Sequence, residues 1–173
     1  GNLAAEIEVI QLAKAQTLES TRLTSGSTAV GQGTLTLTTA NGPVDVVIDG
    51  TNDSLDGLAR AINDKNAGVT ASVITDAQGA RLVLKGNTGE ASAFTLSVPG
   101  GTTSGLERFA FGPGVTGGMA ESQAAQDAIV KLDGVTVNRA RNSFTDLIPG
   151  VQIDLKRAEP GTIVSIGSTR PTA

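Results

Sequence analysis

The 173-residue sequence contains no cysteine, histidine, tryptophan or tyrosine. Without cysteine or histidine, the chain has no disulfide, no thiolate nucleophile, no Ser-His-Asp triad and no ordinary zinc site. Its only aromatic side chains are 4 phenylalanines, which leave little for a nucleobase or a sugar ring to stack on. We therefore expect a protein that is not an enzyme, with no catalytic, cofactor-binding or metal-binding residues.

Positive charge is scarce as well. The 13 Lys and Arg residues are outnumbered by 17 Asp and Glu, which gives a net charge of −4. Nucleic acids and anionic membranes attract clustered positive charge, so we expect neither as a partner. No apolar run approaches the roughly 18–20 residues of a membrane-spanning helix, so membrane insertion is not expected. The chain begins with Gly1 rather than Met, and we interpret it as a fragment excised from a longer protein.

Most of the sequence shows the two-residue alternation of polar and apolar side chains that is typical of half-buried β-strands. Turn residues such as Asn41-Gly42 and Asp133-Gly134 separate successive alternating segments and predict hairpins. The predicted hairpins cover residues 33–49, 69–85 and 128–137, and further strands are predicted at 6–12, 94–98, 151–155 and 162–166.

One α-helix is predicted at residues 55–65. Asp53 or Ser54 can cap its start, and Gly68 follows its end. Its apolar side chains share one face by their helical spacing; they are Leu55, Leu58, Ala59 and Ile62. A shorter helical turn is predicted at residues 143–147. The expected fold class is mainly β (α+β), with two small β-rich domains of hairpins and one or two short helices.

Two segments rich in Gly, Ser and Thr interrupt these patterns, at residues 24–28 and 99–120. Such segments are typical of exposed connections between packed units. Their positions predict an outer domain at residues 29–121. This domain is inserted into a discontinuous inner domain, which is formed by residues 1–28 and 122–173.

Several segments now support a resemblance to a known family. IEVIQLAKAQTL at residues 7–18 is similar to a V-x-x-L-A-x-A-Q-x-L segment of the flagellar filament cap family, hook-associated protein 2 (FliD). SLDGLARAIN at residues 54–63, followed by AGVTASV at 67–73, resembles the hook "I-N" motif that flagellar axial proteins share. RNSFTDLIPGV at residues 141–151 resembles the start of the family's later conserved region. The segments occur in the family's order and span nearly the whole chain.

The resemblance implies a structural and assembly function, without catalysis. The chain would be the head of a cap that lies outside the cell at the flagellum tip and promotes flagellin insertion. The family is exported without a cleaved signal peptide and self-associates into a closed ring of a few subunits. Its partners would be flagellin and neighbouring hook-associated proteins. The family's long terminal helices are absent here, so we expect the fragment alone to be monomeric. Two alternatives stay open: the hook–filament junction protein, and a surface adhesin module.

Two kinds of segment are similar to ligand-binding loops, but each has a simpler interpretation. Residues 49–53 begin like a calcium loop, but Ser54 occupies the sixth position, where glycine is needed, and Arg60 the twelfth, where glutamate should bind. A polar turn and a helix cap are predicted instead. The glycines of segments 31–33 and 112–114 lack the continuation of a phosphate-binding loop, so turns are predicted there.

The phenylalanines and basic residues have two interpretations each. Phe94 and Phe144 fit the core by their spacing. Phe109 and Phe111 would anchor the glycine-rich segment or form an exposed subunit contact. A set of basic residues lies near acidic residues in the sequence, where ion pairs on solvated faces are expected and pairing between ring subunits is the alternative; the set is Arg139, Arg141, Lys156 and Arg157.

Overall fold

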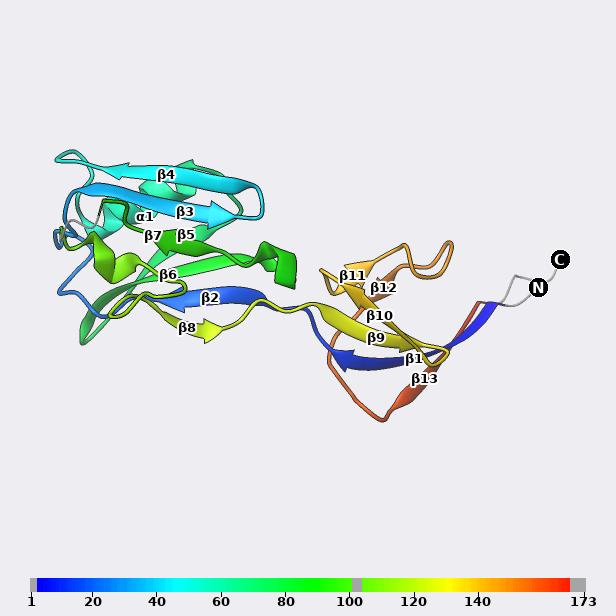
Figure 1. The fold of residues 1–173 in the computed structure, drawn as a ribbon. Helices are drawn as coiled ribbons and strands as arrows, with labels where there is room; N and C mark the ends of the chain where they lie inside the picture. The colour runs from blue at the N-terminus through cyan, green and yellow to red at the C-terminus, as the bar shows by residue number, and fades with distance from the viewer. Residues whose placement is uncertain (1–2, 101–103, 169–173) are drawn as a thin grey trace. The chain divides into compact units, whose positions relative to one another are not determined.

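A computed structural model describes residues 3–100 and 104–168, which form two compact units (Figure 1). Unit 1 comprises Gly1–Lys14, Thr88–Glu90 and Gln126–Ala173, and unit 2 comprises Ala15–Asn87 and Ala91–Ala125. In the described part of the chain, no helix is both long enough and apolar enough to cross a membrane.

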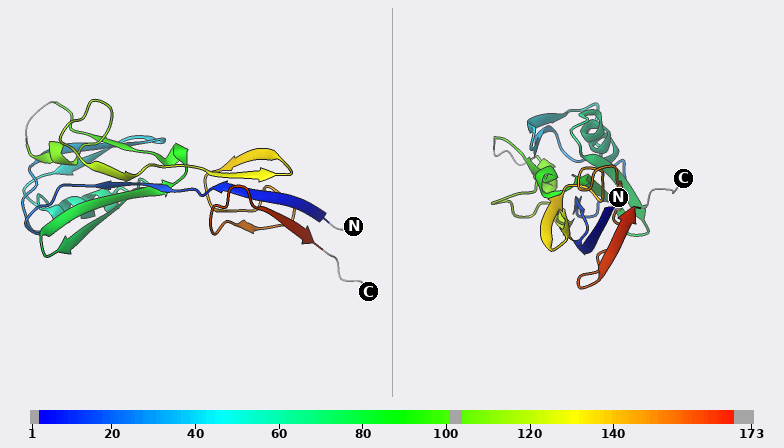
Figure 2. Two further views of the ribbon diagram at one scale, coloured as in Figure 1. Left: turned by 90° about the horizontal axis from the view of Figure 1, so that it is seen from below. Right: turned by 90° about the vertical axis from the view of Figure 1, so that its right-hand side faces the viewer.

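Unit 2 contains two antiparallel sheets and one α-helix (Figures 1 and 2). The four-stranded sheet has the order β5-β6-β2-β8, and the three-stranded sheet has the order β4-β3-β7. Their bounds are β2 Ala15–Glu19, β3 Gly33–Thr39, β4 Gly42–Ile48, β5 Thr70–Asp76, β6 Gly79–Thr88, β7 Thr95–Ser97 and β8 Ala120–Gln123. The helix α1 spans Leu55–Asp64, and two short 3-10 helices span Glu90–Ser92 and Leu106–Phe109. Apolar side chains from both sheets and from α1 form one core.

The helix α1 starts and packs as the sequence predicts. The Gly57 N–H donates to the Ser54 hydroxyl across 3.0 Å, which satisfies one of the free donors at the helix start. Leu55, Leu58 and Ile62 are fully buried, because α1 packs this face against β5 and β4. The three predicted hairpins are also present, as β3–β4, β5–β6 and β9–β10.

Unit 1 is built on a four-stranded antiparallel sheet with the order β10-β9-β1-β13. Its strands are β1 Leu3–Gln11, β9 Ala128–Leu132, β10 Val135–Arg139 and β13 Ile163–Ser168. A small hairpin of β11 Ser143–Phe144 and β12 Ile153–Asp154 covers one face of this sheet. The buried side chains between them are Ile7, Val130, Phe144, Ile148 and Ile153.

The prediction of a helical turn at residues 143–147 is wrong. Residues 143–144 form β11 instead, and α1 is the only α-helix within residues 3–100 and 104–168. The hydroxyl of Ser143, the first residue of the predicted turn, donates to Asp154 on β12 across 2.5 Å. Five residues are too few for a stable isolated helical turn. The extended hairpin, in contrast, buries Phe144 against the sheet of unit 1.

The units divide at other residues than the boundaries expected from composition. The first division lies between Lys14 and Ala15 rather than after residue 28, and the last between Ala125 and Gln126 rather than after 121. The reason is β2, which lies between β6 and β8 inside the sheet of unit 2. The chain after β2 stays paired with β6, because the Ser20 and Leu23 N–H groups donate to carbonyls of β6 across 2.9 and 2.7 Å. That each unit folds independently stays a prediction.

Candidate interaction site

The turn at residues 49–53 has the geometry of a helix entry. The Asp49 carboxylate accepts hydrogen bonds from the Thr51 hydroxyl (2.6 Å) and the Thr51 N–H (2.9 Å). These two bonds hold the pKa of Asp49 below its usual range. Asp53 accepts from the Gln32 side-chain amide across 3.0 Å, while Ser54 caps α1. The predicted polar turn and helix cap are confirmed. Among residues 3–100 and 104–168, no group of three or more acidic side chains is placed to hold a metal ion.

The phenylalanines lie in or against the cores. Phe94 and Phe109 are fully buried in unit 2, and Phe144 is buried in unit 1. Phe111 packs against the core of unit 2, and its backbone forms two hydrogen bonds of 2.9 Å with Leu96 of β7. The predicted anchoring of the glycine-rich segment is confirmed for its described residues; residues 101–103 of that segment lie outside the described part of the chain.

The I-N residues act in packing within unit 2. Ile62 is buried in the core, and the Asn63 side-chain amide pairs with both backbone groups of Ala71 on β5. The Asn63 Oδ1 accepts from the Ala71 N–H across 2.7 Å, and the Asn63 Nδ2 donates to the Ala71 carbonyl across 2.9 Å. The asparagine thus takes the place of a strand partner at the edge of β5.

Two further side-chain amides make the same double pairing. Gln16 pairs with Phe94 in unit 2, across 2.8 and 3.0 Å, and Asn142 pairs with Ala13 in unit 1, across 2.7 and 2.9 Å. Buried backbone groups cost free energy when they lack a partner, so these amides stabilise segments outside the regular ladders. The sequence predicts none of these three pairings, because no periodicity marks a side-chain amide that bonds to the backbone of another segment.

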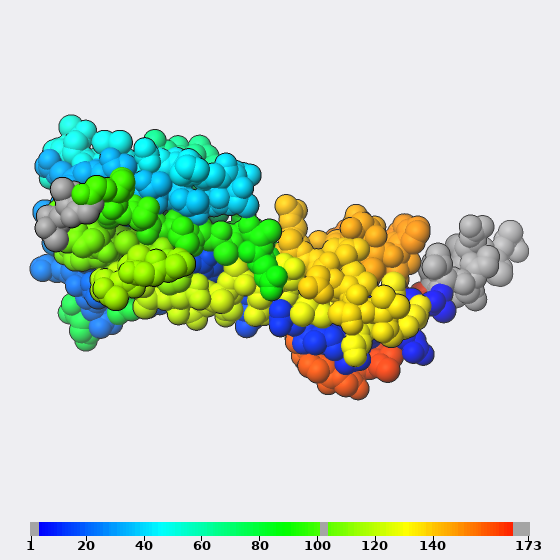
Figure 3. All heavy atoms as spheres, viewed as in Figure 1, coloured from blue at the N-terminus to red at the C-terminus, as the bar shows by residue number. Residues whose placement is uncertain are grey.

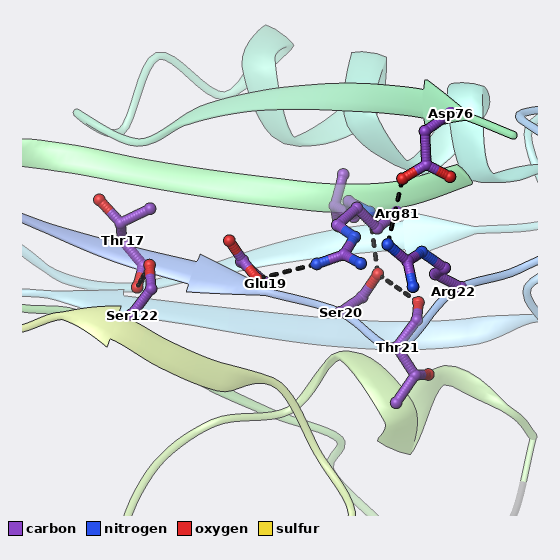
Figure 4. A network of polar contacts seen from close by, with 9 residues as sticks. Thr17, Glu19, Ser20, Thr21, Arg22, Asp76, Arg81 and Ser122 are labelled. Carbon is purple, nitrogen blue, oxygen red and sulfur yellow. Dashed lines mark hydrogen bonds and ion pairs between the residues drawn. The ribbon is translucent and has the colours of Figure 1, made fainter. Parts of the chain in front are cut away.

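A polar network joins β2 and the segment after it to β5 and β6 (Figure 4). Arg81 on β6 contacts Glu19 across 3.0 Å, and Arg22 contacts Asp76 on β5 across 3.1 Å. The pKa of Asp76 is lowered chiefly by a hydrogen bond from the Gln78 N–H, and also by Arg22. Both ion pairs of this network lie within unit 2, where they connect β2 and the segment after it to β5 and β6.

The exposed apolar surface of unit 1 lies at the two edges of its sheet. Ile163 and Val164 of β13 are 62% and 53% exposed, and Val135 of β10 is 64% exposed. β13 carries no charged residue and no proline, the usual protections of an edge strand, whereas the edge strand β4 of unit 2 carries Pro43 and Asp45.

A groove of about 350 Å³ runs beside β13. Its apolar lining is Ile7, Val9, Ile153, Leu155, Val164 and Ile166. Lys156, Arg157 and Glu159 lie around it. An apolar floor with charged side chains at its margin can hold another polypeptide. Unit 1 therefore carries the candidate interaction site.

The predicted basic residues lie near this site, on both edges. Arg139 contacts Asp146 across 3.0 Å and lies 5.9 Å from the centre of the Phe144 ring. Arg157 forms an ion pair with Glu159. Ion pairs on solvated faces are confirmed for these two residues, while Arg141 and Lys156 are exposed. The alternative, pairing between subunits, stays a prediction.

Sequence comparison connects both units to one family. The model of the "Flagellin hook IN motif" matches residues 34–88. The B-type flagellar hook-associated protein 2 of Pseudomonas aeruginosa is 34% identical over 142 residues, which cover 74% of this chain and 30% of that protein. The flagellar hook-associated protein 2 of Escherichia coli K12 is 37% identical over 150 residues, which cover 81% of this chain and 31% of that protein. The chain thus spans about a third of the length of these relatives.

Solved structures extend the similarity to the fold. The D2-D3 domains of the flagellar cap protein FliD from E. coli superpose with a TM-score of 0.87 at 28% identity, covering 96% of this chain and 88% of that chain. FliD (HAP2) from P. aeruginosa superposes with a TM-score of 0.81 at 28% identity, covering 99% and 82%. Together with the sequence matches, these superpositions show that the chain belongs to the family of the flagellar cap protein, hook-associated protein 2 (FliD).

Proposed function

We propose that this chain is the head of a flagellar cap that lies outside the cell at the filament tip and promotes flagellin insertion. The observation that supports this most is the extent of the structural match. Both units together, rather than the I-N region alone, superpose on the D2-D3 domains of the E. coli cap protein over 96% of the chain. A hook–filament junction protein and an adhesin module have less support, because the relatives that match across both units are named hook-associated protein 2.

The mechanism we propose uses no catalytic residue. Full-length subunits would form a closed ring of a few copies, contacting flagellin and neighbouring hook-associated proteins. A ring requires a heterologous contact, in which one surface of a subunit meets a different surface of the next. Export would proceed without a cleaved signal peptide.

A chimera tests this function. The region of the E. coli relative that this chain matches would be replaced by the chain, and the chimera expressed in a strain without its own cap protein. We expect filaments to grow, counted by electron microscopy, whereas the relative with that region deleted should give none. A chimera that is secreted at normal levels but leaves cells without filaments would contradict the proposal.

For the chain alone we expect a monomer, or weak association, at tens of micromolar, because it spans only about a third of the relatives' length. Light scattering measures this directly. A tight, discrete oligomer at that concentration would show that the head suffices for assembly.

A further inference from the structure

The sheet of unit 1 has two free edges, β10 and β13 (Figure 1), among the residues that the structure describes. In an antiparallel ladder, alternate residues direct their N–H and C=O groups to opposite sides of the strand. Glu6 of β1 is bonded toward β9, because its carbonyl accepts from the Asp133 N–H across 2.8 Å. Ile7 therefore directs its groups toward β13, where it pairs with Val164.

The same alternation fixes which groups of each edge are free. Val164 and Ile166 are bonded to β1, so Ile163, Ser165 and Gly167 direct their N–H and C=O groups away from the sheet. On the other edge, Val135 pairs with Leu132 across the two-residue turn Asp133-Gly134 and is bonded to β9. Thr136 and Asn138 therefore direct their backbone groups outward.

These two sets of free groups match in one antiparallel register. When Ser165 of one copy lies opposite Thr136 of a second copy, Ile163 lies opposite Asn138, and each pair can exchange two backbone hydrogen bonds. Between them, Val164 lies opposite Val137, and Ile166 opposite Val135, on the face that carries the groove. The pairing thus covers the exposed apolar side chains of both edges at once.

Charge is complementary at the end of this register. Thr162, which donates its N–H to the Glu159 carbonyl across 3.0 Å, comes opposite Arg139 of the second copy. Each edge carries one ion pair near this point, Arg157–Glu159 beside β13 and Arg139–Asp146 beside β10. Each ion pair contains one basic and one acidic side chain, so Arg139 of one copy can face Glu159 of the other. A self-pairing of two β13 strands would leave Val135 exposed and bring Arg157 no new acidic partner.

We infer that the β13 edge of one copy pairs with the β10 edge of a second copy, in the register that places Val164 opposite Val137. All copies keep the same orientation in this contact, so it is heterologous and can repeat around a ring. The inference rests on the proposed function in one respect, that the partner is a second copy of the chain. β-strand addition of this kind gains affinity from the main chain and specificity from the alternate side chains.

Cysteine cross-linking tests the register without interference, because the chain has no cysteine of its own. Val164→Cys and Val137→Cys proteins would be mixed at about 1 mM, a concentration suited to a weak contact, and oxidised. Facing residues of a non-hydrogen-bonded pair lie close enough for a disulfide. We expect a mixed disulfide dimer as the main product, identified by mass spectrometry. The matched control is Val164→Cys with Thr136→Cys, one residue away on the opposite face, which should not cross-link.

The Ser165→Pro variant tests whether the contact between copies can be lost while each copy stays folded. The Ser165 N–H points outward, so proline removes no hydrogen bond within the chain, and the thermal midpoint should stay unchanged while cross-linking is lost. A mixture of Val164→Cys and Ile166→Cys that cross-links instead would replace the inference by a symmetric β13 pairing. No cross-link in either mixture, with both proteins folded, would overturn edge pairing altogether. If the chimera described above still grows filaments in that case, the proposed function stands and the edge inference alone has failed.

Discussion

Leu58 lies on the buried face of α1, and Arg60 lies on its exposed face. Leu58→Ala should destabilise the protein by about 2–5 kcal/mol, because it removes buried methyl groups and leaves a cavity. Arg60→Ala should change the free energy of unfolding by less than about 0.5 kcal/mol, as for other solvated positions. Urea denaturation of both variants measures this. Equal, small effects would mean that α1 does not pack as described.

Gly57 is in the first turn of α1, where alanine would ordinarily be the better helix former. A Cβ added to Gly57 would lie 2.3 Å from the Asn52 carbonyl oxygen, which is backbone and cannot move aside easily. Gly57→Ala should therefore destabilise the protein by about 1–3 kcal/mol, the usual cost of overpacking, rather than stabilise it. Asp64→Ala, at the exposed end of the same helix, is the control and should stay within about 0.5 kcal/mol of wild type. A stabilised Gly57→Ala protein would contradict the close approach.

Asn63 needs both its donor and its acceptor to pair with Ala71. Asn63→Asp at neutral pH keeps the acceptor but brings a carboxylate oxygen to the Ala71 carbonyl, which should cost about 1–3 kcal/mol. A protonated carboxyl can donate again, so the folded state raises the pKa of the introduced group. The protonated carboxyl group therefore stabilises the folded variant fully below the pKa of the group in the unfolded chain, about 4. This stabilisation is lost as the pH rises through the pKa of the group in the folded state.

Urea midpoints of Asn63→Asp and wild type, compared from neutral to acidic pH, check this sign. The gap between the two proteins should narrow toward acid. Asn41→Asp, in an exposed hairpin turn, controls for the added charge and should show no such narrowing. A gap that stays constant with pH would mean that the Asn63 Nδ2 donation to Ala71 contributes nothing.

At the level of elements, the β5–β6 hairpin carries a pH dependence of opposite sign. The Gln78 N–H and Arg22 lower the pKa of Asp76 in the folded state. Stability from a lowered pKa is present above the unfolded value, about 3.9, and is lost as pH falls through the folded pKa. Wild type should therefore lose more stability than Asp76→Asn between about pH 5 and pH 2.5. Parallel urea titrations of the two proteins would disprove a role for Asp76.

The elements that the sequence predicts correctly are those with clear periodicity. Alternation located the three hairpins, and helical spacing located α1 to within one residue of its end. The sequence does not predict β2, because Ala15 and Gln16 are both buried and the strand therefore lacks a two-residue period. β8 is not predicted either, because it is exposed along most of its length and shows no alternation of apolar residues. The sequence does not show which strands of unit 1 lie at the edges of its sheet, because that depends on the order of the strands in the sheet.

At the level of the whole molecule, strand order decides where the chain can be cut. A protein of residues 15–125 keeps β2 between β6 and β8, and we expect it to unfold cooperatively on its own. A protein of residues 29–121 loses that strand, which leaves the core residues of β6 without cover. Thermal unfolding followed by circular dichroism compares the two. A cooperative transition in the shorter protein alone would reverse our assignment of β2 to unit 2.

The strand order also influences the order in which the parts of the molecule fold. The partners of β2 and of the residue after it lie far along the chain. Ser20 accepts a hydrogen bond from a residue 62 positions later, and Thr17 accepts one from a residue 105 positions later. The side chain of Glu8 in β1 accepts a hydrogen bond from a residue 153 positions later, near the end of the chain. Contacts of such separation form slowly, since loop-closure entropy is lost before they form. If the chain emerged from a narrow channel with its N-terminus first, all residues of unit 2 would be available before those of unit 1, and unit 2 would fold first. Although β1 comes early in the sequence, it would then pair after the strands of unit 2. Hydrogen exchange sampled during refolding should accordingly protect β6 before β1.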